Sequence, residues 1–514
     1  MSAPTEQTGP QRSLLDRSLT EWVRLDWETI AWIGLFIVAV ISRFYDLGAR
    51  AMSHDESLHA LYSYYLYNAG NYEHNPMMHG PFLFHANALM YTLFEDNDAT
   101  ARIVPALTGL GVIWMARLFR RYIGRTGALM AGLLIVISPS LLFHSRYIRN
   151  DIYIALFSMI WIYGAFRYLD TRKLKWVMVM VLGMAFGFIA KENHFMTGAV
   201  LGAFFVGLAL WEVIGRQLFA VISPLILATG LAYLFHVRDQ NTLAIVIVGL
   251  AFIIAAALTI FFMRGKSWSS YRHSIHLDLA VLMLTLVMPF TAPLGHQIMG
   301  WDPLAYTTNT DMFRSVGLVA VVTMLAIIIA YIWYGMRRQD EHRDPFTFGQ
   351  WSKLMAVFWA IQILFFTTFF TNTRNGLATG IVGSLGYWIK QQEVARGGQP
   401  WYYYMMIGGL YEFLPILLTA VGALVALYWF FRAKRWDPVP AGDLPAVIAH
   451  EIDADRRARI DGESGGDIDM PAPVALADLL QTNRLYFLAL SLWWTLGTWA
   501  AYTIAGEKMP WLMT

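Results

Sequence analysis

The chain has 514 residues, of which 57% are hydrophobic and only 14% are charged, and its mean hydropathy is +0.46. This composition is too apolar for an ordinary soluble enzyme and is typical of a protein embedded in lipid. The net charge of +2 is small, which argues against nucleic acid as a partner. The sequence contains no cysteine, which excludes disulfides, thiolate nucleophiles and cysteine-bound metals.

Residues 1–28 are polar, and the apolar run that follows lacks the short hydrophobic region and small-residue cleavage site of a signal peptide. We interpret this run as a first membrane span that is not cleaved. Apolar stretches near the length needed to cross about 30 Å of hydrocarbon recur along the chain. They predict about thirteen transmembrane helices, at residues 29–48, 101–119, 126–143, 151–169, 174–190, 195–214, 217–236, 242–263, 276–294, 315–335, 352–372, 405–431 and 485–505. The predicted fold class is an all-α integral membrane protein.

The orientation follows from lysine and arginine, which favour the cytoplasmic side of short loops. With the N-terminus inside, the inner loops receive most of the basic residues, including the clusters at residues 117–125, 167–175 and 432–435. The opposite orientation would place these clusters outside. The sequence therefore predicts a multi-pass protein of the cell membrane with a cytoplasmic N-terminal segment, residues 1–28.

Two segments that do not span the membrane fall on the outer side under this topology. Residues 49–97 form a first outer loop that is long enough for two short amphipathic helices next to the membrane. In the second outer loop, residues 373–400, apolar side chains at positions 381, 385, 388 and 389 follow helical spacing. This spacing predicts a helix lying in the membrane interface. Residues 29–432 are expected to form one transmembrane domain that carries both loops.

The C-terminal part of the chain has a different organisation. Residues 433–483 are rich in Asp, Glu, Pro and Gly and show little periodicity, which predicts a flexible cytoplasmic insertion. Residues 484–514 hold the last span and a short outer motif, Gly506 to Trp511, after which the chain stops. This abrupt end indicates a truncated chain.

An acidic pair, Asp55 and Glu56, follows the first span and opens an apparent helix. Asp55, His59 and Tyr62 would share one face of that helix because of their spacing. A structural interpretation competes here, since Ser53 followed by Glu56 has the spacing of a capping box. Acidic residues in a first helical turn are also favoured by the helix dipole.

The outer turn between the third and fourth spans carries Arg146, Arg149, Asn150 and Asp151, which places two cations and a carboxylate at the mouth of a helix. The structural alternatives are that Asn150 caps this helix and that both arginines extend to the membrane interface.

The turn between the fifth and sixth spans carries Lys191, Glu192 and His194, and the alternative here is a lysine beside helix-terminal carbonyl groups. The first outer loop adds His79 within a rigid turn that contains two prolines. Ionisable groups at membrane depth are costly and usually functional, so their gathering at one face favours a shared site. Histidines are frequent at this face, but no ligand spacing such as HExxH fixes a metal site, and single hydrogen-bonded histidines are the simpler interpretation.

A carboxylate on one side and fixed cations on the other suit the displacement of a phosphate leaving group. Asp55 would take a proton from an acceptor hydroxyl or amine. Arg146, Arg149 and Lys191 would neutralise the departing phosphate.

These motifs resemble those of the C-type (GT-C) glycosyltransferases, which use polyprenyl-phosphate-linked sugars. The resemblance covers residues 29–215, and beyond them only the helical layout and the motif at residues 506–511 agree. It is strongest to the branch of protein O-mannosyltransferases and lipid A aminoarabinose transferases, and within it to bacterial and archaeal membrane proteins associated with flippase activity. It rests on the acidic pair after the first span, the His79-Gly80-Pro81 turn, the stretch from Ser145 to Asp151 and the Ala190-Lys191-Glu192 turn. Gly80 departs from the commoner His-Pro-Pro pattern of the family.

The resemblance implies an inverting, mannosyltransferase-like glycosyl transfer at the extracytoplasmic face. The donor would be a polyprenyl-phosphate sugar, and the acceptor, which the sequence does not identify, a protein, lipid or glycan. The resemblance assigns Asp55 as catalytic base, Glu56 as its acidic neighbour and Asp151 as the second acid, which holds donor or acceptor. The candidates for substrate and phosphate binding are His79, Arg146, Arg149, Asn150, Lys191, Glu192 and His194.

The expected partners are the lipid-linked donor and membrane lipids, and nucleic acid is not expected. Some relatives need a divalent ion, so the resemblance leaves open a Mg or Mn ion held by Asp55, Glu56 and Asp151.

Two other classes of function compete with the enzyme. A carrier or flippase for lipid-linked sugars would need charges along a pathway through the bilayer midplane, whereas the candidates lie at helix ends on one side. A non-catalytic membrane subunit would bind a partner through its aromatic segment at residues 401–404, but the retained acids argue against this. The sequence therefore favours a membrane glycosyltransferase.

Overall fold

The computed structural model describes residues 26–236, 241–265, 274–306, 308–336, 346–391, 399–400, 402–432 and 476–504. Every regular element within these ranges is a helix, as the apolar spans predicted. The predicted N-terminal segment up to residue 25, the predicted insertion up to residue 475 and the outer motif after Ile504 lie outside the described residues.

The helices follow the predicted spans in chain order, with two helices in the first outer loop. The first ten are α2 (Trp27–Phe44), α3 (His54–Ala69), α4 (Phe82–Leu93), α5 (Asp98–Ala101), α6 (Ile103–Leu118), α7 (Arg120–Ile137), α8 (Pro139–His144), α9 (Asp151–Thr171), α10 (Leu174–Ala190) and α11 (His194–Ile214). They are followed by α12 (Leu218–His236), α13 (Asn241–Met263), α15 (Ile275–Val287), α16 (Ala292–Ile298), α17 (Asn309–Ala330), α18 (Phe348–Phe366), α19 (Thr373–Leu377), α20 (Ser384–Gln391), α21 (Tyr403–Tyr411), α22 (Phe413–Arg432) and α24 (Leu476–Ile504). Short 3-10 or π segments are η2 (Pro76–Met78), η3 (Gly215–Gln217), η4 (Met288–Thr291), η5 (Tyr331–Gly335) and η6 (Ala378–Gly383).

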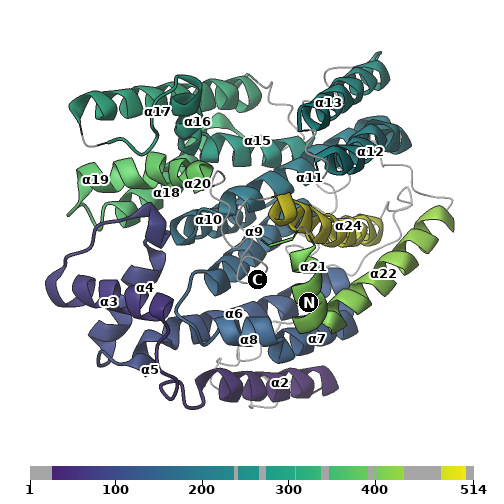
Figure 1. Ribbon diagram of the computed structural model, residues 1–514. Coiled ribbons are helices and arrows are strands. Elements are labelled where there is room, and N and C mark those ends of the chain that lie inside the picture. The colour runs from purple at the N-terminus through teal and green to yellow at the C-terminus, as the bar shows by residue number, and fades with distance from the viewer. Residues whose placement is uncertain are drawn as a thin grey trace, which may run out of the picture.

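The long helices run side by side. Helix α2 packs on α6 and α7, α6 packs on α9, and α9 packs on α10, which in turn contacts α18 (Figure 1). The loop helices α3 and α4 lie at one end of these helices, and α19 and α20 lie toward the same end (Figure 1). Two loops that are far apart in the sequence therefore meet at one end of the bundle, where η2 contacts η6 and α20.

Seven helices among the described residues are long and apolar enough to cross a membrane, or eight if the bent pair α21 and α22 forms one span. The chain is therefore a multi-pass membrane protein, as its composition predicted. The total of about thirteen spans stays a prediction.

Two predicted spans are broken. The span at residues 126–143 divides into α7 and α8, because Pro139 begins a new helix. The span at residues 405–431 was predicted as one helix, and this is wrong: α21 and α22 meet at an angle of 103°. Pro415 has no N–H to donate to the carbonyl of Tyr411, so α21 cannot continue through it. The carboxylate of Glu412 at the bend accepts hydrogen bonds from Ser138 Oγ (2.6 Å) and the Ser140 N–H (3.2 Å).

The second outer loop is helical over residues 373–391, but π segment η6 interrupts the helix. Thr379 and Gly383 are buried, and Thr379 Oγ1 lies 2.9 Å from His74 Nδ1 of the first outer loop. Ile381, one of the four apolar positions, packs against the main hydrophobic core. At that position the apolar spacing reflects packing on the protein, and a location in the membrane interface stays a prediction.

Glycine permits the closest helix contact. A Cβ atom at Gly183 of α10 would overlap the backbone nitrogen of Trp161 on α9, and one at Gly164 of α9 would overlap the backbone of Met180. In membranes, small residues at such contacts let helix backbones approach closely and gain van der Waals packing. This contact fixes where α9 begins relative to where α10 ends.

Charged groups gather at the two ends of the bundle. At one end Glu28 pairs with Arg120 (2.6 Å), and Asp170 pairs with Arg121 (2.7 Å). Asp151, at the first residue of α9, lies at the other end. A helix from Asp151 to Asp170 spans about 28 Å, which is close to the thickness of the hydrocarbon core.

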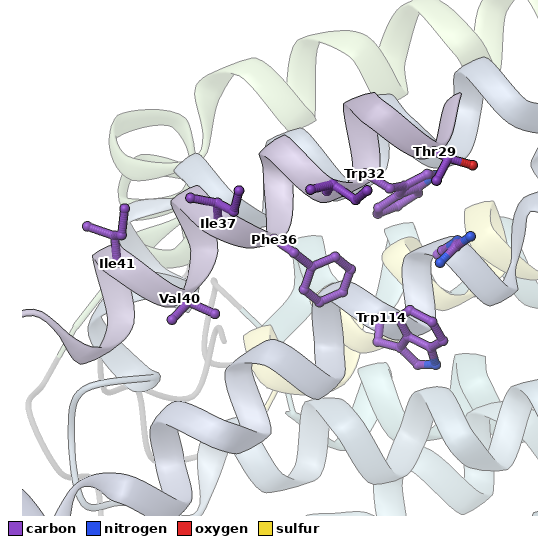
Figure 2. Close-up of a pocket in the computed structure, with 9 residues that line it drawn as sticks. Thr29, Trp32, Phe36, Ile37, Val40, Ile41 and Trp114 are labelled. Atoms are coloured by element: carbon purple, nitrogen blue, oxygen red, sulfur yellow. The ribbon is translucent and has the colours of Figure 1, made fainter. Parts of the chain in front are cut away.

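An apolar groove of about 460 Å³ follows α2 on the outside of the bundle. Figure 2 shows Trp32, Phe36 and Val40 of α2 facing Trp114 of α6 across it. Arg117 is the one charged residue that lines it. The lining suits the hydrocarbon chain of a membrane lipid and offers no groups for catalysis.

Substitution of Gly183 by valine should force α9 and α10 apart. Overpacking of this kind costs about 1–3 kcal/mol, so for a chain of this length the midpoint of thermal unfolding in detergent should fall by about 1–3 °C. Gly34→Val on α2 is the matched control, because a Cβ atom there meets nothing within 4 Å. Equal effects of the two substitutions would contradict the close α9–α10 contact.

Candidate active site

Helix α3 begins with the predicted capping box. The Glu56 N–H donates to Ser53 Oγ, and the Ser53 N–H donates to Glu56 Oε2 at 3.2 Å. The structural interpretation of this pair is therefore confirmed. The cap sets the direction of the first turn and with it the position of Asp55, the second residue of the helix.

Glu56 is fully buried, and both of its carboxylate oxygens are occupied. Arg102 Nε donates to Oε1 at 3.0 Å, and Arg50 Nη2 donates to Oε2 at 2.7 Å. The Ile148 N–H also donates to Oε1. A carboxylate in this state has no lone pair to spare for a proton or a metal, so the geometry favours a positioning role for Glu56 rather than the predicted catalytic one.

Sequence reasoning missed Arg50 and Arg102, which are the partners of Glu56. Arg102 comes 46 residues after Glu56 in the chain, so no local pattern joins them. Arg50 lies six residues before Glu56, and its guanidinium also stacks over the rings of Phe143 and Tyr147. Only this nearer arginine left a signal in the sequence, as a cation beside the acidic pair.

Arg149 joins the two other predicted acids. Its Nη1 lies 2.7 Å from Asp55 Oδ2, and its Nε lies 3.4 Å from Asp151 Oδ2. The Asp55 side chain is 40% exposed, whereas that of Asp151 is only 4% exposed. The cluster therefore has a solvent-exposed carboxylate and a buried carboxylate on either side of the Arg149 guanidinium.

Lys191 completes the inner side of this cluster. Its Nζ donates to Asp151 Oδ1 at 2.7 Å, and both side chains are buried. His144 Nδ1 lies 3.9 Å from Asp151 Oδ2. The predicted convergence of the Asp55 loop, the Asp151 turn and the Lys191 turn at one place is thus present in the structure.

His79 and Glu192 form a second pair next to this cluster. His79 Nδ1 donates to Glu192 Oε2 at 2.9 Å. The Gly80 N–H donates to the Ala190 carbonyl at 3.1 Å, and a Cβ atom at Gly80 would overlap the carbonyl of Ile189. Glycine at this position therefore docks the first outer loop on the end of α10 and brings His79 to Glu192.

Arg146 lies outside the cluster. Its guanidinium donates to the carbonyl oxygens of Ser42 (3.0 Å), Tyr45 (2.8 Å) and Asp46 (3.2 Å) at the end of α2. Cations favour helix C-termini because the last carbonyls lack partners within the helix. The geometry gives this arginine a capping role and provides no support for phosphate binding.

Asn150 and His194 are buried polar side chains of a different kind. Asn150 makes no side-chain cap, so that structural alternative is wrong, and neither atom of its amide has a partner among the described residues. His194 packs between the rings of Trp161 and Phe188, and its ring nitrogens likewise have no described partner. Asn150 directly precedes Asp151 of the cluster in the sequence, whereas His194 belongs to the hydrophobic core.

The carboxylates do not fit a metal ion as the structure arranges them. No group of three or more His, Asp or Glu side chains in the described ranges has an arrangement that could hold one. Asp55 and Asp151 already face Arg149, and Glu56 faces two arginines. A divalent ion needs several free oxygen ligands, which these ion pairs do not leave.

His59 follows Asp55 by one helical turn and is neutral. Its pKa is lowered to about 4, mainly by burial and also by the nearby His79 and Arg149, against the opposing hydrogen bond from Nδ1 to the Asp55 carbonyl. Burial likewise lowers the pKa of His74 to about 4. Two uncharged imidazoles therefore accompany the cluster at neutral pH.

Comparison with known proteins finds one family that part of the chain resembles. Residues 78–238 match the family model of dolichyl-phosphate-mannose-protein mannosyltransferases. This match contains the predicted residues from His79 to His194 and begins after Asp55 and Glu56. Over these residues, about a third of the chain, it is similar to that family, which agrees with the resemblance of its motifs to the mannosyltransferase branch of the GT-C glycosyltransferases. No curated protein sequence matches the chain.

Solved structures that match the chain include an archaeal oligosaccharyltransferase and ArnT. The archaeal oligosaccharyltransferase AglB from Archaeoglobus fulgidus, solved with an inhibitory peptide and a dolichol-phosphate, is 14% identical, with 93% of this chain and 56% of that chain covered and a TM-score of 0.33. ArnT from Cupriavidus metallidurans, solved in the apo state, is 15% identical, with 93% and 78% covered and a TM-score of 0.28. The present chain thus spans little more than half the length of AglB.

Substitution of Glu56 by glutamine should destabilise the protein strongly. It leaves the buried Arg102 without a counter-charge, and breaking a buried ion pair from one side costs about 3–5 kcal/mol. The thermal midpoint in detergent should fall well below that of the control Glu95→Gln, which removes an exposed carboxylate. A Glu56→Gln protein as stable as this control would contradict the anchoring role.

Stability should also fall on acidification. The unfolded chain protonates His59 and His74 near pH 6.5, whereas the folded protein resists protonation until about pH 4. The unfolded state therefore binds more protons as the pH falls from 6.5 toward 4, and the folded state loses stability in that window. The thermal midpoint should be lower at pH 5 than at pH 7, with a smaller difference in a His59→Gln/His74→Gln variant. The exposed His54→Gln variant should keep the full difference, and unchanged behaviour of the double variant would refute this origin.

Proposed function

We propose that this protein transfers a sugar from a polyprenyl-phosphate-linked donor to a nucleophilic acceptor at the extracytoplasmic membrane face. The observation that carries the proposal is the cluster in which Arg149 lies between the exposed acid Asp55 and the buried acid Asp151, with Lys191 behind. Its members come from three separate loops. The name of the matching family supports the class of donor, a sugar on a dolichyl phosphate. The acceptor class is a protein, lipid or glycan.

Asp55 is the acid best placed to act as the base. Its side chain is 40% exposed and can meet an acceptor, whereas Asp151 is closed off by Lys191 and Arg149. Asp55 accepts the proton of the acceptor hydroxyl or amine as the acceptor atom forms a bond to the anomeric carbon. The bond from that carbon to the phosphate oxygen breaks, and its electron pair leaves with the phosphate. A single displacement of this kind inverts the anomeric centre.

Arg149 links donor binding to the activity of the base. The guanidinium of Arg149 occupies Asp55 Oδ2, where the proton of the acceptor would have to bind. The phosphate of the donor competes for the same guanidinium, which favours bidentate phosphate oxygens. When Arg149 turns to the phosphate, Asp55 is released to accept a proton. Lys191 adds a second positive charge near the leaving group, held in place by Asp151.

The orientation in the membrane belongs to the same proposal. The Asp55 cluster lies at the end of the bundle opposite the cluster of Glu28, Arg120 and Arg121. Basic residues favour the cytoplasmic side, so the N-terminus is cytoplasmic and the site is extracytoplasmic. Lipid-linked sugars would reach the site laterally from the bilayer.

The central test is the substitution Asp55→Asn in the purified protein. It removes the base and keeps the shape of the side chain, so transfer from a polyprenyl-phosphate sugar should fall by about 100-fold or more. The reaction is followed as labelled sugar that moves to the acceptor, with membrane extract as the first acceptor source. The anomeric configuration of the product, read by NMR, tests inversion.

Asp96→Asn is the matched control, since Asp96 is an exposed acid in the same outer loop. It should retain full transfer. Full activity of Asp55→Asn would refute the assignment of the base. Movement of labelled lipid-linked sugar across vesicles without its consumption would instead identify the protein as a carrier.

A further inference from the structure

A polar pocket of about 700 Å³ opens at the same end of the bundle as the charged cluster. Its walls come from the first outer loop at residues 73–76, from Tyr306 before α17 and from the segment between Asn372 and Thr379. No local pattern predicts this pocket, because its three parts are separated from one another by more than 60 residues along the chain. None of its lining residues belongs to the cluster of Asp55, and the pocket therefore needs a separate explanation.

His74 is a buried lining residue with one ring nitrogen to spare. Thr379 Oγ1 donates its proton to the Asn375 carbonyl at 2.8 Å, so it can only accept from His74 Nδ1, which lies 2.9 Å away. Nδ1 then carries the imidazole proton, and Nε2 has a free lone pair. Nε2 is buried and has no partner among the described residues. His74 therefore presents an unused hydrogen-bond acceptor.

Asn372 presents the complementary group. Its Nδ2 is buried and has no partner in the described part of the chain. An amide nitrogen is a donor with two protons. A buried donor or acceptor without a hydrogen-bond partner costs about 1–3 kcal/mol of stability. A ligand that bonds to both His74 and Asn372 removes this cost, which favours its binding. A hydroxyl group both donates and accepts, and neighbouring hydroxyls on one ligand match such a pair.

The charges of the pocket balance. Glu73 and Arg374 are its two charged lining residues, and they are of opposite sign. Arg374 is exposed and donates to Asn309 Oδ1 at 3.2 Å. A pocket without net charge has no electrostatic preference for a phosphate, in contrast to the Arg149 and Lys191 side of the cluster. This balance favours a ligand without net charge.

The remaining lining groups suit a sugar ring. Asn75 and Asn375 add exposed amides, each with donors and an acceptor. The half-buried ring of Tyr306 offers an apolar face with a hydroxyl at its tip. This mixture of amides with apolar surface favours a glycan over a lipid chain.

The pocket adjoins the proposed active site through η2. This single 3-10 turn runs from Pro76, which lines the pocket, to Met78, and its cap is His79, the partner of Glu192. At about 2 Å per residue, Pro76 and His79 are about 6 Å apart along the turn. Glu192 also acts electrostatically on His74 itself.

We propose that this pocket binds a neutral glycan, which is the acceptor of the transfer reaction. This inference rests on the proposed function and specifies its acceptor class. His74 Nε2 accepts a hydrogen bond from one sugar hydroxyl, and Asn372 Nδ2 donates to another. The bound sugar extends past His79 toward the cluster of Asp55.

The test measures binding of neutral sugars to the full chain in a detergent without a sugar head group. Methyl α-mannoside, mannotriose and maltotriose are the probes, and saturation-transfer NMR is the readout. At least one sugar should bind, and Asn372→Ala should weaken its affinity by tenfold or more. His74→Phe should do the same, and Asn372→Ala alone decides the matter if that variant does not fold. Asn68→Ala, an exposed amide on α3 outside the pocket, is the matched control and should bind normally.

The outcomes separate this inference from the proposed function. Asp55→Asn should retain sugar binding while it loses transfer, so a wrong base assignment alters only the transfer assay. Absence of binding by every probe at 50-fold excess over protein, about the limit of weak carbohydrate affinities, overturns the glycan pocket. Equal binding by Asn372→Ala and the parent overturns it as well. Binding of an uncharged Ser/Thr hexapeptide that is lost in Asn372→Ala, without sugar binding, would assign the pocket to a peptide instead.

Discussion

The ion pairs of the buried Glu56 carboxylate are the interactions on which the Asp55 end of the helix bundle depends. The carboxylate receives Arg102 from the start of α6, Arg50 from the end of the first loop turn and the Ile148 N–H from the turn before α9. Three parts of the chain are thereby fixed to the first turn of α3. Breaking such a buried pair from one side is far more costly than losing a surface pair, so the arrangement is rigid.

That rigidity explains the different states of two adjacent acids. Glu56 is buried and both of its carboxylate oxygens are bonded to arginines. Asp55, one residue earlier on the helix, pairs with Arg149 and is still partly exposed to solvent. Because successive helical residues point about 100° apart, a capped first turn can anchor one acid and present the other. The anchor and the proposed base are therefore parts of one local structure.

Close backbone contacts bring the remaining loops to this place. Gly80 docks on the end of α10, and Gly183 lets α10 lie directly against α9. These contacts align the end of α10, with Lys191 and Glu192, beside the start of α9, with Asp151. The same first outer loop then continues into the wall of the polar pocket. A side chain at Gly80 would separate the pocket and the charged cluster from each other.

The position and type of nearly every helix could be predicted from the sequence, because the length of an apolar run is a local property that the thickness of a bilayer fixes. The breaks at Ser138 and Glu412 were missed, although Pro139 and Pro415 are local signals for both. The gathering of Asp55, Asp151 and Lys191 at one face also followed from the sequence. Each lies at a helix end, and alternation of the spans puts those ends on one side of the membrane.

Only the tertiary structure decided which partner each charged group has. Arg146 and Arg149 occupy the same turn, yet one caps α2 through carbonyl groups and the other joins two carboxylates. Arg149 has one partner, Asp151, two residues along the chain, but its other partner, Asp55, is 94 residues away. The Ser42 carbonyl that Arg146 binds is 104 residues away, so the local sequence does not assign these partners. Arg102 and the pocket at His74 could not be predicted from the sequence either, because the residues that meet there are far apart in the chain. The sequence determines which groups lie at this end of the helices, and the packing of loops distant in sequence determines which partners those groups have.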